Sequence, residues 1–488
     1  MTDWNNKKVL VIGLGKSGRC AAAHLAGQGA EVCMMGTDAV EVPYPDSEIE
    51  LLKRSGVRVV LGQASIPAEP FELAVVNPGV MLGSSIISAV QQAGIPIVGE
   101  LELGYREIHC PNIAITGTNG KTTTTHLIRE VLQSSQRKTE IADHLETPIC
   151  SLIDQSMALD FLTLEVTSFQ LETICDFRPS IGVLLNLVPD HLDHYDSLDA
   201  YARVKARLFE NQQPHDWCVI QSEALARLRS LGVRIPGKVM TFSAENRRAD
   251  VYLDRGLLIS KVEGWTGPLL NMVDGHLSGP HQAENLMAAL LVGRILRIPL
   301  ETAKKATQSF KTLPHRGERV RELGGVLYIN DSKAGNPHAT AQALRSVRPV
   351  RAGEPNIWLI AGGDDKGLQH HDLGPLISQR VKGVFLIGKS RDRLRAAWSL
   401  FAPCQFCEDL VEAISGAAKQ ALPSDVVLLS PACSSLDMFR DDEHPGEVFR
   451  KAVNQLSTSR MPSKDASAVE SVVPSFDQKP SSIAADKQ

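Results

Sequence analysis

Short apolar runs recur along the chain, and many are followed by a glycine-rich or polar turn and then by helix-forming residues. Runs of this length predict buried strands, and the longer stretches between them predict helices. Alternation of strand and helix indicates an α/β fold with parallel sheets. The predicted strands are residues 8–12, 31–35, 57–61, 73–76, 96–98, 112–115, 161–166, 326–330, 357–361, 384–387 and 426–430.

Two breaks divide this pattern, one at Cys110-Pro111 and one at the turn Leu313-Pro314-His315-Arg316. They predict three domains, at residues 1–110, 111–312 and 313–456. The length of 488 residues agrees, at roughly 100–200 residues a domain. Residues 457–488 are rich in Ser, Pro, Ala, Asp and Lys without hydrophobic periodicity, which predicts a disordered tail.

Composition narrows the class of protein. The net charge is −5 without a long basic block, so a nucleic-acid surface is not indicated. No run approaches the ~20 apolar residues of a membrane helix, and the N-terminus lacks a signal-peptide core. The nine scattered cysteines read as reduced thiols of a cytoplasmic protein. One CxxC pair, Cys404 and Cys407, offers two ligands where a structural zinc needs four, so packing is the favoured reading.

Two glycine-rich loops follow predicted strands. The first, Gly13-Leu14-Gly15-Lys16-Ser17-Gly18, has the G-x-G-x-x-G spacing that brings a phosphate to a helix N-terminus. An acidic ribose partner is not evident after the second strand, which ends before Gly36. This loop therefore suits a nucleotide diphosphate better than a nicotinamide cofactor.

The second loop, Thr116-Gly117-Thr118-Asn119-Gly120-Lys121-Thr122, lies between a strand and a helix. Its glycines can turn backbone N–H groups toward phosphate oxygens, Lys121 supplies a charge for the β- and γ-phosphates, and the Thr122 hydroxyl can ligate magnesium. It is a shorter form of the usual P-loop. The loop predicts a nucleoside triphosphate site, against the alternative of a chance glycine turn.

Carboxylates and histidines follow two further strands. Glu165 is near the carboxyl end of one, where it can hold magnesium beside a P-loop. A second strand is expected to break at Pro189 and deliver Asp190, His191, Asp193 and His194 into a loop. Helix caps for the two aspartates and a plain surface role for His191 remain alternatives. Lys205, on a predicted helix one turn after Tyr201, is by its spacing alone a surface lysine.

The motifs GTNGKT, EVTSFQLE, NLVPDHLDHY, GPHQAEN, LPHRGE, INDSK and SPACSSLD, together with Lys205, resemble those of the Mur ligases in content and order. EVTSFQLE, LPHR, NDSKAGN and LLSPACSSLDMF are most similar to the MurD-type branch. The resemblance covers about residues 8–455. It implies a Rossmann-like N-terminal domain for a UDP substrate, a central P-loop domain for ATP, and a Rossmann-like C-terminal domain for an amino acid.

The resemblance also implies an activity: addition of D-glutamate to UDP-N-acetylmuramoyl-L-alanine through an acyl phosphate, with ATP and two Mg²⁺ sites, in peptidoglycan precursor synthesis. Lys121, Lys205 and His191 would be catalytic, and Lys205 would be carbamylated. The implied metal ligands are Thr122, Glu165, His191 and Lys205. ATP would contact Thr118, Asn119, Gly120, Lys121, Thr122, Thr123, Gln282, Asn285, Arg316, Asp331 and Lys333, with His315 at the nucleotide's edge. The UDP substrate would contact Gly15, Lys16, Ser17, Thr37, Gly79, Thr167 and Gln170, and the amino acid Lys366 and Ser435.

Several positions depart from the family pattern, and all but Gln282, which would contact the adenine, concern the recognition of UDP and of the amino acid. Alternatives therefore stay open: a Mur-like ligase for L-glutamate or another amino acid, a nucleotide-binding paralogue without catalysis, and an NAD-linked oxidoreductase built on the first loop. We expect a monomer whose partners are small molecules, with neither nucleic acid nor membrane. The departures are at Gly36, His144, Glu146, Gln282, Gly335, Asp442 and Pro445.

Overall fold

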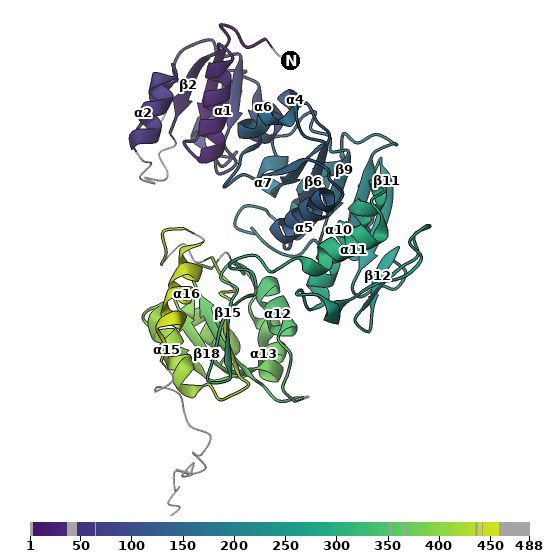
Figure 1. The fold of residues 1–488 in the computed structure, drawn as a ribbon. Coiled ribbons are helices and arrows are strands. Elements are labelled where there is room, and N and C mark those ends of the chain that lie inside the picture. Colours follow the sequence, from purple (N-terminus) through teal and green to yellow (C-terminus); the bar gives the residue numbers. More distant parts are fainter. Residues whose placement is uncertain are drawn as a thin grey trace, which may run out of the picture.

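The computed structural model describes residues 3–36, 46–63, 65–351, 353–365, 367–434, 438–441 and 443–457. Its strands form three separate sheets that follow one another along the chain, each flanked by helices (Figure 1). The α/β class and the three-part architecture predicted from the sequence are confirmed. Thr37, Lys366, Ser435, Asp442 and residues 458–488 of the expected tail lie outside the described residues.

The N-terminal sheet has the strand order β3-β2-β1-β4-β5, and all its pairs are parallel. The order reverses between β1 and β4, which is where α/β sheets open a crevice for ligands. The helix after the first glycine loop begins at Lys16, and Gly15 is its N-cap. The elements are β1 (Lys8–Ile12), α1 (Lys16–Gly27), β2 (Glu31–Met35), α2 (Asp46–Arg54), β3 (Arg58–Val60), β4 (Leu73–Val76), α3 (Ser85–Gln92) and β5 (Ile97–Gly99).

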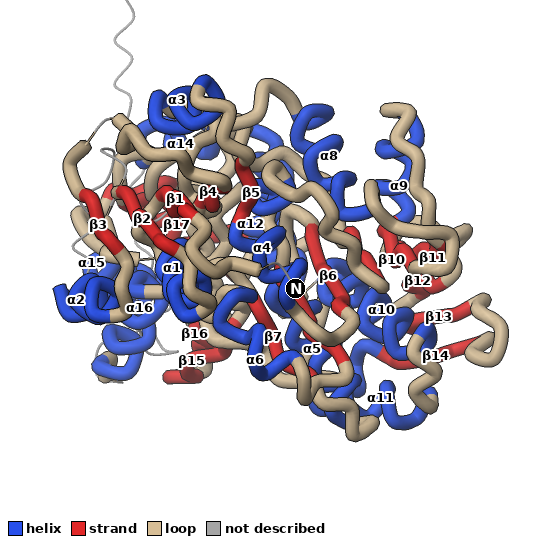
Figure 2. The backbone as a smooth tube through the Cα atoms, turned by 90° about the horizontal axis from the view of Figure 1, so that it is seen from above, coloured by secondary structure: helices blue, strands red, loops and turns tan. Residues whose placement is uncertain are grey.

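The central sheet has nine strands in the order β14-β13-β12-β11-β10-β9-β6-β8-β7. Its P-loop side is parallel, whereas β12, β13 and β14 pair antiparallel and lie at the far side of the molecule from β2 and β3 (Figure 2). The elements are β6 (Asn112–Thr116), α5 (Lys121–Ser134), β7 (Thr139–Ala142), η1 (Ile149–Leu152), α6 (Ile153–Ser156), β8 (Phe161–Glu165), α7 (Ser168–Leu171), β9 (Ile181–Leu184), α8 (Leu198–Ala206), η2 (Arg207–Phe209), β10 (Trp217–Gln221), α9 (Ser222–Ser230), β11 (Lys238–Ser243), β12 (Val251–Asp254), β13 (Leu257–Ser260), β14 (Gly267–Asn271), η3 (Met272–Asp274), α10 (Pro280–Ile295) and α11 (Leu300–Ser309).

The C-terminal sheet has the order β15-β16-β20-β17-β18-β19, with an antiparallel edge strand β15. The edge strands β15 and β19 were not predicted, because their mixed polar sequences carry no buried run. The elements are β15 (Glu318–Leu323), β16 (Val326–Asn330), α12 (Pro337–Ser346), β17 (Ile357–Gly362), η4 (His371–Leu373), α13 (Gly374–Arg380), β18 (Val381–Ile387), α14 (Arg391–Trp398), β19 (Cys404–Phe406), α15 (Leu410–Gln420), β20 (Val426–Leu429) and α16 (His444–Gln455).

Helix α4 (Glu100–Glu107) joins the N-terminal and central sheets, and it buries three glutamates. Glu102 accepts backbone hydrogen bonds from Cys175, Asp176 and Phe177 at 2.8–3.0 Å, so the helix is anchored to the central domain. Glu100 accepts one from the Cys150 backbone at 2.8 Å. Burial raises the pKa of Glu100 to about 7.

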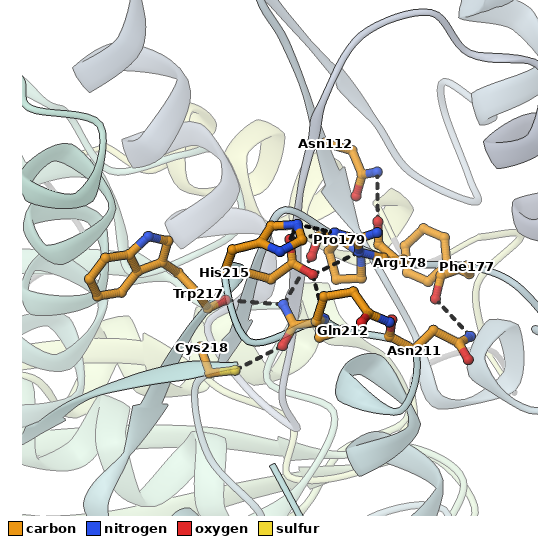
Figure 3. Close-up of polar contacts among 11 residues, drawn as sticks. Asn112, Phe177, Arg178, Pro179, Asn211, Gln212, His215, Trp217 and Cys218 are labelled. Carbon is orange, nitrogen blue, oxygen red and sulfur yellow. Dashed lines mark hydrogen bonds and ion pairs between the residues drawn. The ribbon is translucent and has the colours of Figure 1, made fainter. Parts of the chain in front are cut away.

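The amino ends of β6, β9 and β10 are tied by a polar network at the edge opposite the P-loop (Figure 3). Arg178 donates to both carboxylate oxygens of Asp216, at 2.7 and 3.2 Å. Gln212 donates to the carbonyls of Pro179 and Trp217, and its amide oxygen accepts from the Cys218 thiol. The network satisfies strand-end backbone groups, so its role is structural.

Candidate active site

The P-loop leaves β6 at Thr116 and enters α5 at Lys121. Gly120 has φ +90°, and a Cβ there would lie 2.4 Å from the Asn285 amide oxygen, so only glycine fits. The Lys121 ammonium donates to the carbonyls of Gly117 and Thr118, at 3.1 and 3.0 Å. Lys121 therefore lies over the loop that the sequence assigns to phosphates.

The P-loop is held by the loop that follows β9. Asn119 and Asn186 exchange two hydrogen bonds, each 2.9 Å long, between backbone and side-chain amide. The Thr118 hydroxyl donates to the carbonyl of Val188 at 3.0 Å. These bonds fix the phosphate loop relative to the segment that carries His191.

A cavity of about 1300 Å³ opens beside this loop, between the central and C-terminal domains. Helix α10 contributes Asn285, whose amide oxygen accepts from the Thr124 hydroxyl of α5 at 3.1 Å and whose nitrogen donates to Gln282 at 3.0 Å. Asn285 thus links the cavity wall to the P-loop helix. The predicted ATP residues that line the cavity are Asn119, Gly120, Thr123, Gln282, Asn285, Arg316, Asp331 and Lys333.

The C-terminal domain supplies the other wall. Arg316 donates to the Thr122 hydroxyl at 2.7 Å, so this domain reaches the P-loop helix. Burial raises the pKa of Asp331 to about 7, although Ser430 and the Gly317 backbone donate to its carboxylate. The neighbouring Lys333 pairs with Glu443 at 3.0 Å.

His315 does not follow the expectation of a place at the nucleotide's edge. Its side chain is buried in the C-terminal domain, where the Asn330 amide nitrogen and the Ser332 hydroxyl lie 3.2 and 3.4 Å from its Nδ1. A Cβ on Gly446 would overlap the same ring. His315 therefore packs the turn that presents Arg316.

Lys205 is buried, and the surface position predicted from spacing alone is wrong. Only 1% of Lys205 is exposed, because α8 turns Tyr201, Ala202, Lys205 and Ala206 toward the sheet. Its nitrogen donates to the Thr116 hydroxyl at 3.3 Å, at the end of β6. Burial, and then the charge of Lys121, lower the pKa of Lys205 well below its ordinary value, against the opposing effect of Asp190 and Glu165. Lys205 therefore lies in surroundings that disfavour the charged ammonium.

No single side chain among the implied metal ligands would make a magnesium site; the site would need oxygen atoms from several of them. Glu165 ends β8 in register with Ile115, beside the P-loop strand, and offers carboxylate oxygens. Among the described residues, no three His, Cys, Asp or Glu side chains group as a metal site by themselves. The Thr122 hydroxyl and a carboxylated Lys205 would add the oxygen ligands that magnesium prefers.

The loop with His191 begins earlier than expected, since β9 ends at Leu184 rather than at Pro189. Asp190 and Asp193 do not cap α8, whose N-cap is Ser197. Asp190 is 7% exposed and accepts from the backbone N–H of His191 at 2.9 Å, while Asp193 is exposed. His191 adopts φ +53°, a left-handed conformation that is rare for a residue other than glycine.

Glu172 orders the end of this loop and was not singled out from the sequence. Its carboxylate accepts from the Tyr195 hydroxyl at 2.6 Å and lies 2.8 Å from Nε2 of His194. The ring of Phe169 packs edge-on against His191 and His194, with centroid distances of 5.0 Å. The motif EVTSFQLE thus supports the His191 loop through its last glutamate and its phenylalanine.

The first glycine loop packs against Asn77, which the sequence analysis missed. A Cβ at Gly15 would lie 2.7 Å from the Asn77 amide, and the Gly18 backbone donates to Asn77 at 3.3 Å. Gly79 lies on the same turn after β4. A polar residue directly after a strand at the reversal of strand order was the available signal.

Of the other residues expected at the UDP substrate, Lys16 is exposed at the start of α1, and Ser17 donates to the carbonyl of His144 in the central domain at 3.1 Å. Thr167 and Gln170 form a capping box at the start of α7, in which each side chain accepts from the other's backbone. Their present contacts are structural.

The CxxC pair behaves as packing. Cys407 is buried and Cys404 is half-buried in β19. Burial raises the pKa of both thiols, that of Cys407 to about 11, which disfavours the thiolate form that would bind a metal. In the part of the chain that the structure describes, no helix has the length and apolar character to cross a membrane.

Three sequence families match consecutive parts of the chain. They are the Mur ligase MurD-like N-terminal domain at residues 7–99, the Mur ligase middle domain at 115–293, and the Mur ligase glutamate ligase domain at 315–433. Among solved structures, a MurC ligase of Thermotoga maritima has a TM-score of 0.58 at 18% identity, covering 92% of this chain and 99% of that one. A pseudomurein peptide ligase type C of Methanothermus fervidus has the same TM-score at 17% identity, covering 93% and 100%. These likenesses concern the fold.

Curated relatives are more similar in sequence. A UDP-N-acetylmuramoylalanine–D-glutamate ligase of Pelotomaculum thermopropionicum is 37% identical over 461 residues, which cover 93% of this chain and 99% of that relative. The enzyme of the same name from Koribacter versatilis is 35% identical over 457 residues, covering 93% and 99%. The chain therefore belongs to the Mur ligase family and is a ligase of the MurD type.

Proposed function

We propose that this ligase joins D-glutamate to UDP-N-acetylmuramoyl-L-alanine and converts ATP to ADP and phosphate in the reaction. The observation that carries the proposal is the burial of Lys205 beside the P-loop strand, where its nitrogen donates to the Thr116 hydroxyl at 3.3 Å and where the charges of Lys121, Asp190 and Glu165 act on it. A P-loop alone is compatible with many phosphoryl-transfer reactions. A lysine buried at its edge supports a ligase in which that amine becomes a metal-bridging carboxylate.

The reaction that fits has two steps. The substrate carboxylate attacks the γ-phosphorus of ATP, and the bond between that phosphorus and the oxygen bridging the β- and γ-phosphates breaks. ADP departs, and the substrate becomes an acyl phosphate. The amine of glutamate then attacks the acyl carbon, a C–N bond forms, and phosphate departs while the amine loses a proton. A carboxylate is a poor acyl donor, and phosphorylation supplies the leaving group. The protein positions the reactants and stabilises the charge that develops on the phosphoryl oxygens.

Lys121 would stabilise that charge. Its ammonium is already held at the loop by the carbonyls of Gly117 and Thr118, and it can exchange them for phosphate oxygens by a rotation of its side chain. Arg316, Asp331 and Lys333 line the cavity beside the P-loop from the C-terminal domain.

The chemistry of Lys205 supports its carbamylation. The lone pair of the neutral amine attacks carbon dioxide, a C–N bond forms and the nitrogen releases a proton, which leaves a carboxylate on the side chain. A charged ammonium could not react in this way, so the lowered pKa of Lys205 is the enabling property. Magnesium, when bound by Thr122, Glu165, His191 and this carboxylate, would neutralise phosphate charge at two sites.

Phosphate release tests the proposal. The purified protein is mixed with ATP, Mg²⁺ and UDP-N-acetylmuramoyl-L-alanine, in parallel with D-glutamate, L-glutamate or no amino acid. Release that depends on D-glutamate is expected. Release with L-glutamate alone would keep the ligase and change its substrate, a possibility that the departures at Gly335 and Asp442 make worth testing. No release with any amino acid, while ATP still binds, would contradict the proposal.

A further inference from the structure

Asn336 of the C-terminal domain contacts the loop that carries His191, residues 185–197 of the central domain, here named the metal loop. Asn336 is the N-cap of α12, where its amide oxygen accepts from the Ala339 backbone at 2.8 Å. Its amide nitrogen points the other way and donates to Asp190 of the central domain at 3.0 Å and to the side-chain oxygen of Asn119 at 3.2 Å. Asn336 is 4% exposed, so these bonds are made away from water.

The two carboxylate oxygens of Asp190 accept hydrogen bonds from two different segments. One oxygen accepts from Asn336, and the other accepts from the backbone N–H of His191. That second bond closes the turn in which His191 has φ +53°. A non-glycine residue holds this conformation only when its surroundings impose it. The buried carboxylate of Asp190 therefore connects the turn at His191 to Asn336 of the C-terminal domain.

A second contact from α12 acts on the P-loop. Nδ1 of His338 lies 3.0 Å from the amide nitrogen of Asn119. Burial lowers the pKa of His338 to about 4, so the ring is neutral and Nδ1 can accept this hydrogen bond. Asn119 is also held by Asn186 of the central domain. The start of α12 thus touches both the phosphate loop and the metal loop.

We propose that Asn336 is a positioning residue that makes the turn at His191 depend on docking of the C-terminal domain. This inference rests on the proposed function, because it assigns His191 to the catalytic metal. Docking also delivers Asp331 and Lys333, which precede Asn336 on the same segment after β16, to the cavity. Phosphoryl transfer is then favoured only when the domain that receives the amino acid is in place, and an undocked domain leaves the metal loop relaxed.

Two substitutions separate this role from that of the helix cap. Serine and aspartate are both good N-caps, so Asn336→Ser and Asn336→Asp keep the bond to Ala339. Asn336→Ser removes the donor to Asp190, and Asn336→Asp places a second carboxylate against it. Asn271, the N-cap of η3, accepts from Val273 at 3.2 Å, and Asn271→Ser is the matched control.

The expected result is a fall in kcat for ligation of about tenfold or more for Asn336→Ser and a larger fall for Asn336→Asp. The magnesium concentration for half-maximal rate should rise in both, while the melting temperature and the affinity for ATP stay close to those of Asn271→Ser. A kcat and a magnesium dependence equal to the control in both variants would overturn the inference.

Exchanging the amide and the carboxylate between Asn336 and Asp190 gives a second, independent test. In an Asp190→Asn background the added Asn336→Asp should be harmless or beneficial, since an amide and a carboxylate again face each other. If Asn336→Asp is as harmful there as in the wild type, the two residues are not coupled and the inference falls.

Small-angle X-ray scattering measures docking without turnover. Asn336→Asp should increase the radius of gyration of the full chain relative to the wild type, and Asn271→Ser should not. An unchanged radius for Asn336→Asp would overturn the inference. A wild-type protein that ligates no amino acid would instead refute the proposed function, and the scattering comparison would still decide whether Asn336 holds the domain.

Discussion

Lys205 and Tyr201 lie one turn apart on α8, and the amine nitrogen of Lys205 is 4.8 Å from the centroid of the Tyr201 ring. The ring is 2% exposed and shields one side of the amine from water, while the Thr116 hydroxyl lies on another side. A charged ammonium would be costly in this position. The arrangement therefore favours a neutral amine that can react.

The first prediction concerns that amine. Lys205→Ala should lower the ligation rate on the order of 10²-fold or more, because the carboxylated side chain would be lost as a metal ligand. A short carboxylate such as acetate should restore part of the rate by entering the space left behind. Steady-state phosphate release, with and without acetate, measures both effects.

Lys205→Met is the matched control for this rescue. Methionine fills the space and cannot be carboxylated, so activity should be lost without recovery in acetate, and the fold should be retained. Full activity of either variant without additive would return Lys205 to a structural role.

The second prediction concerns the P-loop. Lys121→Ala should reduce turnover on the order of 10³-fold, since the side chain would stabilise charge on the transferred phosphoryl group. The melting temperature should change little, because the bonds from Lys121 to the carbonyls of Gly117 and Thr118 lie within the P-loop itself. Calorimetry and phosphate release on the same sample check the two parts. Near wild-type turnover would show that the loop is not the catalytic phosphate site.

The five strands of the N-terminal sheet, β6 and β8 of the central sheet, β16, β17, β18 and β20 of the C-terminal sheet, and the P-loop could be predicted from the sequence because they depend on local pattern; β7 and β10 to β14 were not predicted. β6, a glycine turn and α5 follow one another without a gap, and a buried strand needs only its own apolar run. The burial of Lys205 could not be predicted from the i, i+4 spacing and needed the pattern of the whole helix. On α8 the buried stripe is Tyr201, Ala202, Lys205 and Ala206, and the lysine within an otherwise apolar stripe was a signal of burial that the i, i+4 spacing alone did not convey.

The partners that residues contact in distant segments could not be predicted, even where the position of one residue carried a signal. Asn77 bonds to the Gly18 backbone, and Asn336 bonds to Asp190, 146 positions earlier in the chain. Asn77 directly follows β4 and meets its partner within the N-terminal domain, whereas Asn336 is the N-cap of α12 and meets Asp190 only where two domains pack together. The edge strand β15 depends in the same way on its pairing with β16.

The third prediction uses the buried Glu100. Its pKa is raised to about 7, mainly by burial, so the folded protein holds a proton there that the unfolded chain releases at its ordinary pKa. The stability associated with this proton is fully present below the unfolded pKa and is lost as the pH rises toward 7, at a cost of about 3 kcal/mol. Glu100→Gln removes the charge that must be buried.

Glu100→Gln should therefore raise the free energy of unfolding at pH 8 more than at pH 5. Urea unfolding at the two pH values measures the difference. Glu102→Gln should have the opposite sign at both, because Glu102 accepts three backbone N–H groups and pairs with Arg106. Equal effects of Glu100→Gln at both pH values would show that Glu100 is ionised in the folded protein.

The fourth prediction concerns the amino ends of β6, β9 and β10, at the end of the central sheet away from the P-loop. It separates an effect on stability from an effect on catalysis. Asp216 accepts from Arg178 and from the Gln213 backbone, and although burial opposes it, these bonds and the charge of Arg178 hold the pKa of Asp216 below its ordinary value. Its contribution to stability is present above the unfolded pKa and is lost as the pH falls through the folded one. Asp216→Asn should cost about 1–3 kcal/mol at pH 7 and less in acid.

Asp274→Asn is the control, since Asp274 is exposed on η3. At temperatures where Asp216→Asn is folded, its kcat and its KM for ATP should match those of the control, because the network lies at the amino ends of β6, β9 and β10 whereas the P-loop lies at their carboxyl ends. A change in KM for ATP without a change in stability would mean that the two edges of the sheet are coupled, and the network of Figure 3 would then belong to the active site rather than to the scaffold.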